Sequence, residues 1–72
     1  MVGLPEDLTL DVVDHLLGEA EEHRIEQVVL IEHLTRQAES TVEAERILTE
    51  IEAIIAALRC RRSYLEAMRA KP

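Results

Sequence analysis

The 72-residue chain has no phenylalanine or tryptophan, one tyrosine, one cysteine, two glycines and two prolines. A single cysteine cannot form an internal disulfide or a Cys-x-x-Cys metal site, which excludes small secreted disulfide scaffolds and zinc ribbons. The shortage of aromatic residues argues against a base-stacking surface for nucleic acid. The sequence also lacks both an apolar run of about 18 residues and a signal-peptide pattern, so we expect a soluble cytoplasmic protein without membrane contact.

The apolar residues, 47% of the chain, are mostly leucine, isoleucine, valine and alanine, as is typical of helix bundles and coiled coils. The net charge of −7 is uneven, because residues 1–58 carry −11 and residues 59–72 carry +4. An acidic surface repels nucleic acid and anionic lipid. We therefore do not expect nucleic acid as a partner, unless it binds at the last fourteen residues.

Apolar residues recur at alternating spacings of three and four in two segments, which predicts helices over about residues 10–38 and 42–70 and a turn at 39–41. The seam of the first helix comprises Leu10, Val13, Leu17, Ala20, Arg24, Gln27, Ile31, Leu34 and Ala38. The seam of the second comprises Ala44, Ile47, Ile51, Ile54, Leu58, Arg61, Leu65 and Met68, widened by Leu48 and Ile55.

Helix starts are also visible in the sequence. Thr9 is a suitable N-cap for the first helix, and Ser40 with Glu43 forms a capping-box pattern before the second, with Thr41 as an alternative cap. Two helices of about 43 Å joined by a short turn predict an all-α antiparallel hairpin that forms one domain over residues 1–72. One continuous helix of about 60 residues is the competing interpretation, and Gly18 is a possible break in the first helix.

A set of positions in the second half carries a family resemblance. These positions are Thr41-x-x-Ala44-Glu45-x-x-Leu48 and Leu58-Arg59-x-x-Arg62 followed by Leu65. Over about residues 24–65 the chain resembles small uncharacterised bacterial proteins built as helix, short turn and helix. That resemblance implies the hairpin fold and no chemistry. Members of that group usually open the turn with glycine and have aspartate before the threonine, whereas Ala38, Glu39 and Ser40 stand here.

Both predicted helices carry more apolar surface than one hairpin can cover. Segments 28–31 and 54–58 are apolar all round, and they lie at different distances from the turn. Two hairpins with their turns at opposite ends would bring these segments level. The sequence therefore predicts a homodimeric four-helix bundle. Its expected interface residues are Val28, Ile31, Ile51, Ile54, Ile55 and Leu58.

Three polar residues interrupt the predicted seams: Arg24, Gln27 and Arg61. Polar residues at seam positions cost stability but fix the register and the number of chains, so we expect a structural role for them. Arg61 is predicted to lie opposite the small Gly18, with acidic residues of the first helix within reach as charge partners.

Metal-binding and catalytic patterns are weak. His15, Glu19 and His23 lie four residues apart on one helix and are the best candidate metal ligands, but no Glu-x-x-His motif of the di-iron bundles is complete. Cys60 has no cysteine partner and no histidine near it on its helix. We therefore expect no metal, no cofactor and no enzymatic activity.

These observations favour a small homo-oligomeric protein-protein interaction module that acts as an adaptor, subunit or regulator. One alternative is a regulator that binds RNA or another nucleic acid through Arg59, Arg61 and Arg62 in the basic C-terminal segment. The other alternative is a metal-binding bundle that uses the histidine and carboxylate face.

Overall fold

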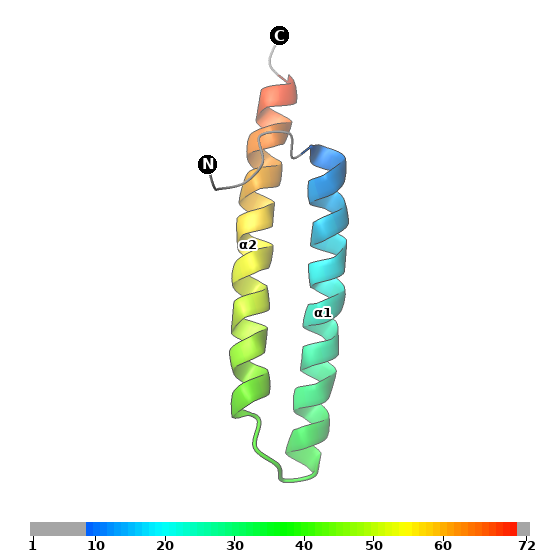
Figure 1. The fold of residues 1–72 in the computed structure, drawn as a ribbon, viewed down its shortest axis with the longest axis vertical. Coiled ribbons are helices and arrows are strands. Elements are labelled where there is room, and N and C mark those ends of the chain that lie inside the picture. The colour runs from blue at the N-terminus through cyan, green and yellow to red at the C-terminus, as the bar shows by residue number, and fades with distance from the viewer. Residues whose placement is uncertain (1–8, 71–72) are drawn as a thin grey trace, which may run out of the picture.

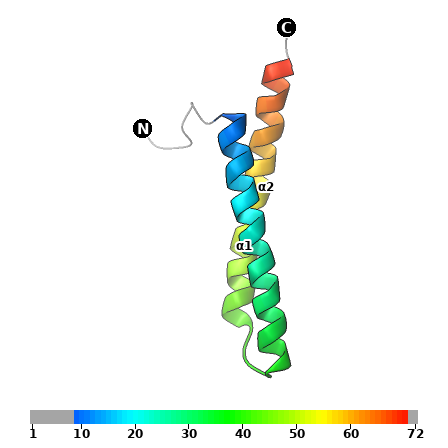
Figure 2. The same cartoon turned by 90° about the vertical axis from the view of Figure 1, so that its right-hand side faces the viewer.

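The computed structural model describes residues 9–70, which form two antiparallel helices lying side by side (Figures 1 and 2). Helix α1 spans Leu10–Arg36 and helix α2 spans Val42–Ala70. The described residues contain no strand. The predicted all-α hairpin is therefore confirmed, and the alternative of one continuous helix is wrong. Helix α1 runs through Gly18 without a break.

Helix α1 begins as the sequence predicts. Thr9 has an extended backbone, and its hydroxyl accepts a hydrogen bond from the backbone N–H of Val12 at 3.3 Å. Asp11 lies in the first turn, where the helix dipole favours a negative charge. The cap satisfies one of the backbone donors that a helix start leaves without a partner.

The end of α1 differs from the prediction, because the helix stops at Arg36 rather than at residue 38. Ala38 has a φ of 59°, in the left-handed region. This conformation lets the N–H of Glu39 donate to the Leu34 carbonyl at 2.9 Å and the N–H of Ala38 donate to the Thr35 carbonyl at 3.1 Å. The two bonds make a Schellman motif, whose left-handed position is usually glycine. Ala38 thus belongs to the turn and not to the seam.

Helix α2 is capped by Thr41. Its carbonyl accepts the backbone N–H of Glu45 at 2.8 Å, and its hydroxyl donates to the Glu45 carboxylate at 3.0 Å. The predicted capping box of Ser40 and Glu43 does not form, because the Glu43 carboxylate accepts hydrogen bonds from Arg46 instead. The Ser40 hydroxyl accepts from the N–H of Val42 at 3.4 Å.

The core is the seam between the two helices, and it is thin. Among the described residues, the buried ones are Val13, Leu17, Ala44 and Ile55. Half-buried residues extend the seam in both directions and include Leu10, Ala20, Arg24, Gln27, Ile31, Leu34, Ile47, Leu48, Ile51, Leu58, Arg61 and Leu65. Both predicted seams are largely correct, but Ile55 takes the inward position in α2 while Ile54 and Met68 are more than half exposed.

Candidate interaction surface

The two sides of the hairpin seam differ in chemistry. On one side, ion pairs link the helices: Arg59 Nη2 lies 3.1 Å from Glu21 Oε2, and Arg62 Nε lies 3.2 Å from Asp14 Oδ1. Arg62 also approaches Glu66 of its own helix at 3.5 Å. These pairs join the acidic first half of α1 to the basic end of α2, so two of the basic residues in segment 59–72 are paired with carboxylates of α1.

On the other side, an open groove of about 280 Å³ runs along the seam. Its lining includes Leu16, Ala20 and His23 from α1 and Ile51, Ile54 and Leu58 from α2. Residues seven positions apart lie on the same side of a coiled-coil helix. On α1, Leu30 therefore lies on the same side as Leu16 and His23. On α2, the residues on the same side as Ile54 are Ile47, Arg61 and Met68. We call the surface formed by these two rows the apolar face: Leu16, His23 and Leu30 on α1, with Ile47, Ile54, Arg61 and Met68 on α2.

The apolar side chains of this face are accessible. Leu16 is 37% exposed, Leu30 40%, Ile54 53% and Met68 55%. Leu16, Leu30, Ile47 and Met68 were not among the interface residues predicted from the sequence. They could have been predicted from the sequence, because they belong to two sets of residues spaced seven apart next to the predicted seams: 16, 23 and 30, and 47, 54, 61 and 68.

The predicted dimer-interface residues do not all lie on one surface. Ile54 is exposed on the apolar face, whereas Ile55 is 4% exposed and packs inside the hairpin. Ile51 and Leu58 are half-buried and line the groove. Val28 and Ile31 are half-buried residues of α1.

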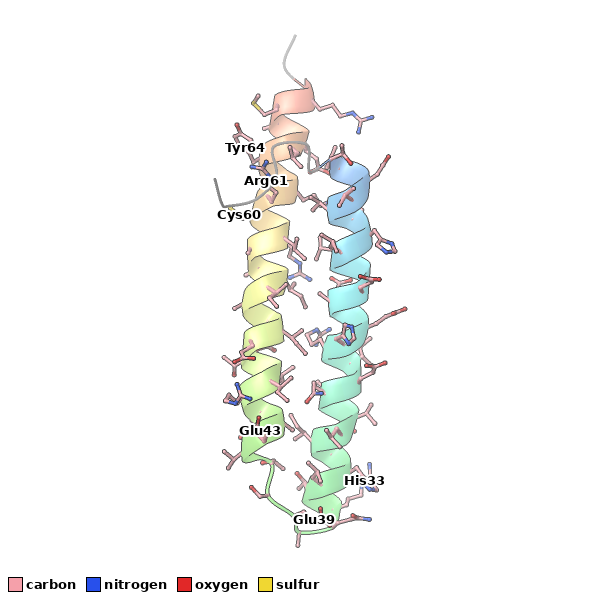
Figure 3. The ribbon with its side chains drawn as sticks, in the orientation of Figure 1. His33, Glu39, Glu43, Cys60, Arg61 and Tyr64 are labelled. Atoms are coloured by element: carbon pink, nitrogen blue, oxygen red, sulfur yellow. The ribbon has the colours of Figure 1, made fainter. Side chains whose placement is uncertain are left out.

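The three polar seam residues lie half-buried at the seam, as predicted. Two of their atoms, Gln27 Oε1 and Arg61 Nε, are buried and have no hydrogen-bond partner among the described residues. The guanidinium of Arg61 lies 5.4 Å from the ring centroid of Tyr64, one turn further along α2 (Figure 3). An added Cβ at Gly18 would meet no atom within 4 Å, so the predicted packing of Arg61 against Gly18 is wrong.

The candidate metal ligands are not brought together. His15 Nε2 lies 3.2 Å from Glu19 Oε2, but His23 Nδ1 instead faces Glu26 Oε1 at 3.5 Å. No group of three histidine, cysteine, aspartate or glutamate residues suited to a metal occurs within residues 9–70. Cys60 is exposed.

The candidate nucleic-acid contacts are also divided. Arg59 and Arg62 pair with carboxylates of α1, and Arg61 lies on the opposite side of the seam beside Tyr64. The three guanidinium groups therefore do not form one basic patch.

One further charged cluster lies near the start of α2. Arg46 contacts both Glu43 and Glu50, the latter with 2.7 Å between Nη1 and Oε2. The hydrogen bond and the charge of Arg46 lower the pKa of the Glu43 carboxyl, and the two carboxylates raise the pKa of Arg46. All three side chains are exposed, so the cluster stabilises the first turns of α2 only weakly.

Within the described residues, neither helix has an apolar stretch long enough to cross a membrane. No protein-family model, curated protein or solved structure matches the chain.

Proposed function

We propose that the protein is a small homodimeric interaction module in which two hairpins pack through their apolar faces into a four-helix bundle. The bundle serves as a subunit, adaptor or regulator, and its role is binding without catalysis. The observation that supports this proposal is the contrast between four buried core residues and an apolar face on which Leu16, Leu30, Ile54 and Met68 are 37–55% exposed.

The burial pattern explains why a partner is needed. Domains of fewer than about 70–80 residues rarely obtain enough stability from one core, and helical ones often gain it by association. Fully burying a large aliphatic side chain contributes about 1.5–3 kcal/mol. Leu16, Leu30 and Ile54 are 37–53% exposed, so covering them would contribute about a third to a half of that amount per side chain. The groove on the opposite side is lined mostly by charged residues, among them Arg24, Glu52 and Arg59, so the apolar face is the side better suited to an apolar partner.

The direct test is the mass of the protein in solution. Sedimentation equilibrium or light scattering at tens of micromolar should give twice the chain mass of 8.2 kDa. A mass of one chain, with the helical circular dichroism signal intact, would contradict the proposal.

A pair of matched variants locates the interface. Ile54→Glu places a charge on the apolar face and should dissociate the dimer, because an unpaired charge in a packed interface is costly. Ile25→Glu is the control, since Ile25 is 55% exposed, close to the 53% of Ile54, but lies outside the apolar face. This control should remain dimeric. Equal weakening by both variants would show that association does not use this face.

A further inference from the structure

The ion pairs that join the two helices show which of their residues lie at the same height. Asp14 pairs with Arg62, and Glu21 pairs with Arg59. The residue numbers of these pairs add up to 76 and 80. A residue of α1 and a residue of α2 at the same height therefore have numbers whose sum lies between 76 and 80. By this relation His23 is level with about residue 55 of α2. The middle of the apolar face is therefore formed by His23 on α1 and Ile54 on α2.

The α1 row of the apolar face is symmetric about its centre. His23 has a leucine seven residues before it, Leu16, and a leucine seven residues after it, Leu30. A second copy of this row, turned end for end about His23, places Leu16 against Leu30 at both ends. Leucine then meets leucine at both ends of the row, and His23 meets His23 of the second copy at its centre.

Two twofold arrangements bring the apolar faces of two hairpins together. If the turns lie at opposite ends, α1 packs on α1 of the second copy and α2 packs on α2. If the turns lie at the same end, α1 packs on α2 of the second copy, which sets Leu16 against Arg61 and His23 against Ile54. The second arrangement gives Leu30 an apolar partner, Ile47, but only the first arrangement gives both Leu16 and Leu30 one.

The first arrangement also provides a partner for Arg61. In this arrangement the twofold axis lies level with residue 55 of α2. Arg61 lies six residues after that position, so it faces the position six residues before it, 49, in the second copy. Arg61 is therefore level with Glu50 of the second copy to within one residue. The Glu50 side chain is 62% exposed beside the face. Arg61 forms no ion pair with a carboxylate among the described residues, unlike Arg46, Arg59 and Arg62. A carboxylate on the second copy would supply such a pair as a charge-assisted hydrogen bond to the guanidinium.

We infer that two copies of the chain pack with their turns at opposite ends, with Leu16 of each against Leu30 of the other and Arg61 of each against Glu50 of the other. This inference rests on the proposed function, since it names the arrangement of that same dimer. The charge pairs fix its orientation and register, and the leucine pairs supply its apolar contact.

Spin labels at the turn distinguish the two orientations. Glu39 lies exposed in the turn, and the labelled variant is Glu39→Cys in a Cys60→Ser background (Figure 3). Sixteen residues separate the height of Glu39 from that of His23, so turns at opposite ends lie about 48 Å apart at 1.5 Å per residue. Turns at the same end lie within about 25 Å, because packed helices are separated by only 8–10 Å.

Pulsed electron–electron double resonance measures the distance between the two spin labels of the dimer, and three outcomes are informative. A distance near 48 Å supports the inference. A short distance in a sample with the mass of a dimer overturns the orientation but leaves the proposed function standing. No dipolar coupling in a sample with the mass of a single chain overturns both.

Charge exchange tests the Arg61–Glu50 contact separately. Arg61→Glu and Glu50→Arg should each raise the dissociation constant of the dimer by about tenfold or more, and the double variant should recover most of that loss. Additive weakening in the double variant would overturn the contact. Arg62→Glu is the matched control, because Arg62 pairs with Asp14 on the other side of the seam, and the dissociation constant should be unchanged.

Discussion

Replacing Ala38 with glycine should stabilise the protein, although alanine is the better residue almost everywhere in helices. Ala38 has a φ of 59° and closes the Schellman motif at the end of α1. In that conformation the Cβ of an L-residue crowds its own backbone, which costs about 1–2 kcal/mol. Glycine carries no such penalty and leaves both backbone hydrogen bonds of the motif in place.

The expected magnitude follows from two opposing effects. Relief of the left-handed strain gains about 1–2 kcal/mol. The greater freedom of glycine in the unfolded chain removes about 0.4–1 kcal/mol. The net gain in the free energy of unfolding therefore lies between about 0 and 1.6 kcal/mol. Its middle value of about 0.8 kcal/mol corresponds to a rise in Tm of about 3–6 °C for a chain of this size.

Urea and thermal unfolding followed by circular dichroism at 222 nm measure this gain. Wild type and variant must be compared at one protein concentration, because association couples to folding. Ala53→Gly makes the same chemical change at an exposed position inside α2 and should destabilise by about 1 kcal/mol. If Ala38→Gly destabilised the protein as this control does, the left-handed turn and its Schellman motif would be wrong.

Three further substitutions test the structure. Gly18→Ala should raise the free energy of unfolding in urea by about 1 kcal/mol, since the new Cβ meets no atom within 4 Å; a loss would place Gly18 in a close contact. Arg59→Gln should change stability by less than about 1 kcal/mol, because its pair with Glu21 is exposed to solvent; a larger loss would indicate a buried pair. Arg46 lowers the pKa of Glu43 from its ordinary value of 4.5. The pair therefore stabilises the fold fully at pH values above 4.5. This stabilisation is lost as the pH falls through the lowered pKa of Glu43 in the folded protein. Unfolding curves of wild type and Arg46→Gln should therefore converge in acid, and NMR titration of Glu43 in the variant should show its pKa raised towards 4.5.

The existence, order and approximate length of the helices were predictable because each depends on local chemistry. A spacing of three and four residues marks the buried side of a helix whatever lies opposite, and Thr9 can cap a helix start with its own hydroxyl. The end of α1 was harder to place. Ala38 carries none of the signal that glycine would give at a left-handed position, so the sequence extended the helix to residue 38.

The candidate surface was predictable only in part. The sequence identified an excess of apolar residues in segments 28–31 and 54–58 but assigned both Ile54 and Ile55 to the interface between chains. Neighbouring residues on a helix point about 100° apart, so packing against α1 decides which of the two is covered. It covers Ile55 and leaves Ile54 on the apolar face.

By itself, then, the sequence determined an acidic two-helix hairpin with more apolar surface than its own seam can bury, since composition, periodicity and caps act over a few residues. The tertiary structure decided which side of the seam stays apolar. Asp14 and Glu21 pair with Arg62 and Arg59, while Arg61 lies on the other side beside Tyr64. The physical reason is that the sequence pattern does not distinguish adjacent apolar residues such as Ile54 and Ile55. Which of them is buried depends on the height and rotation of one helix relative to the other.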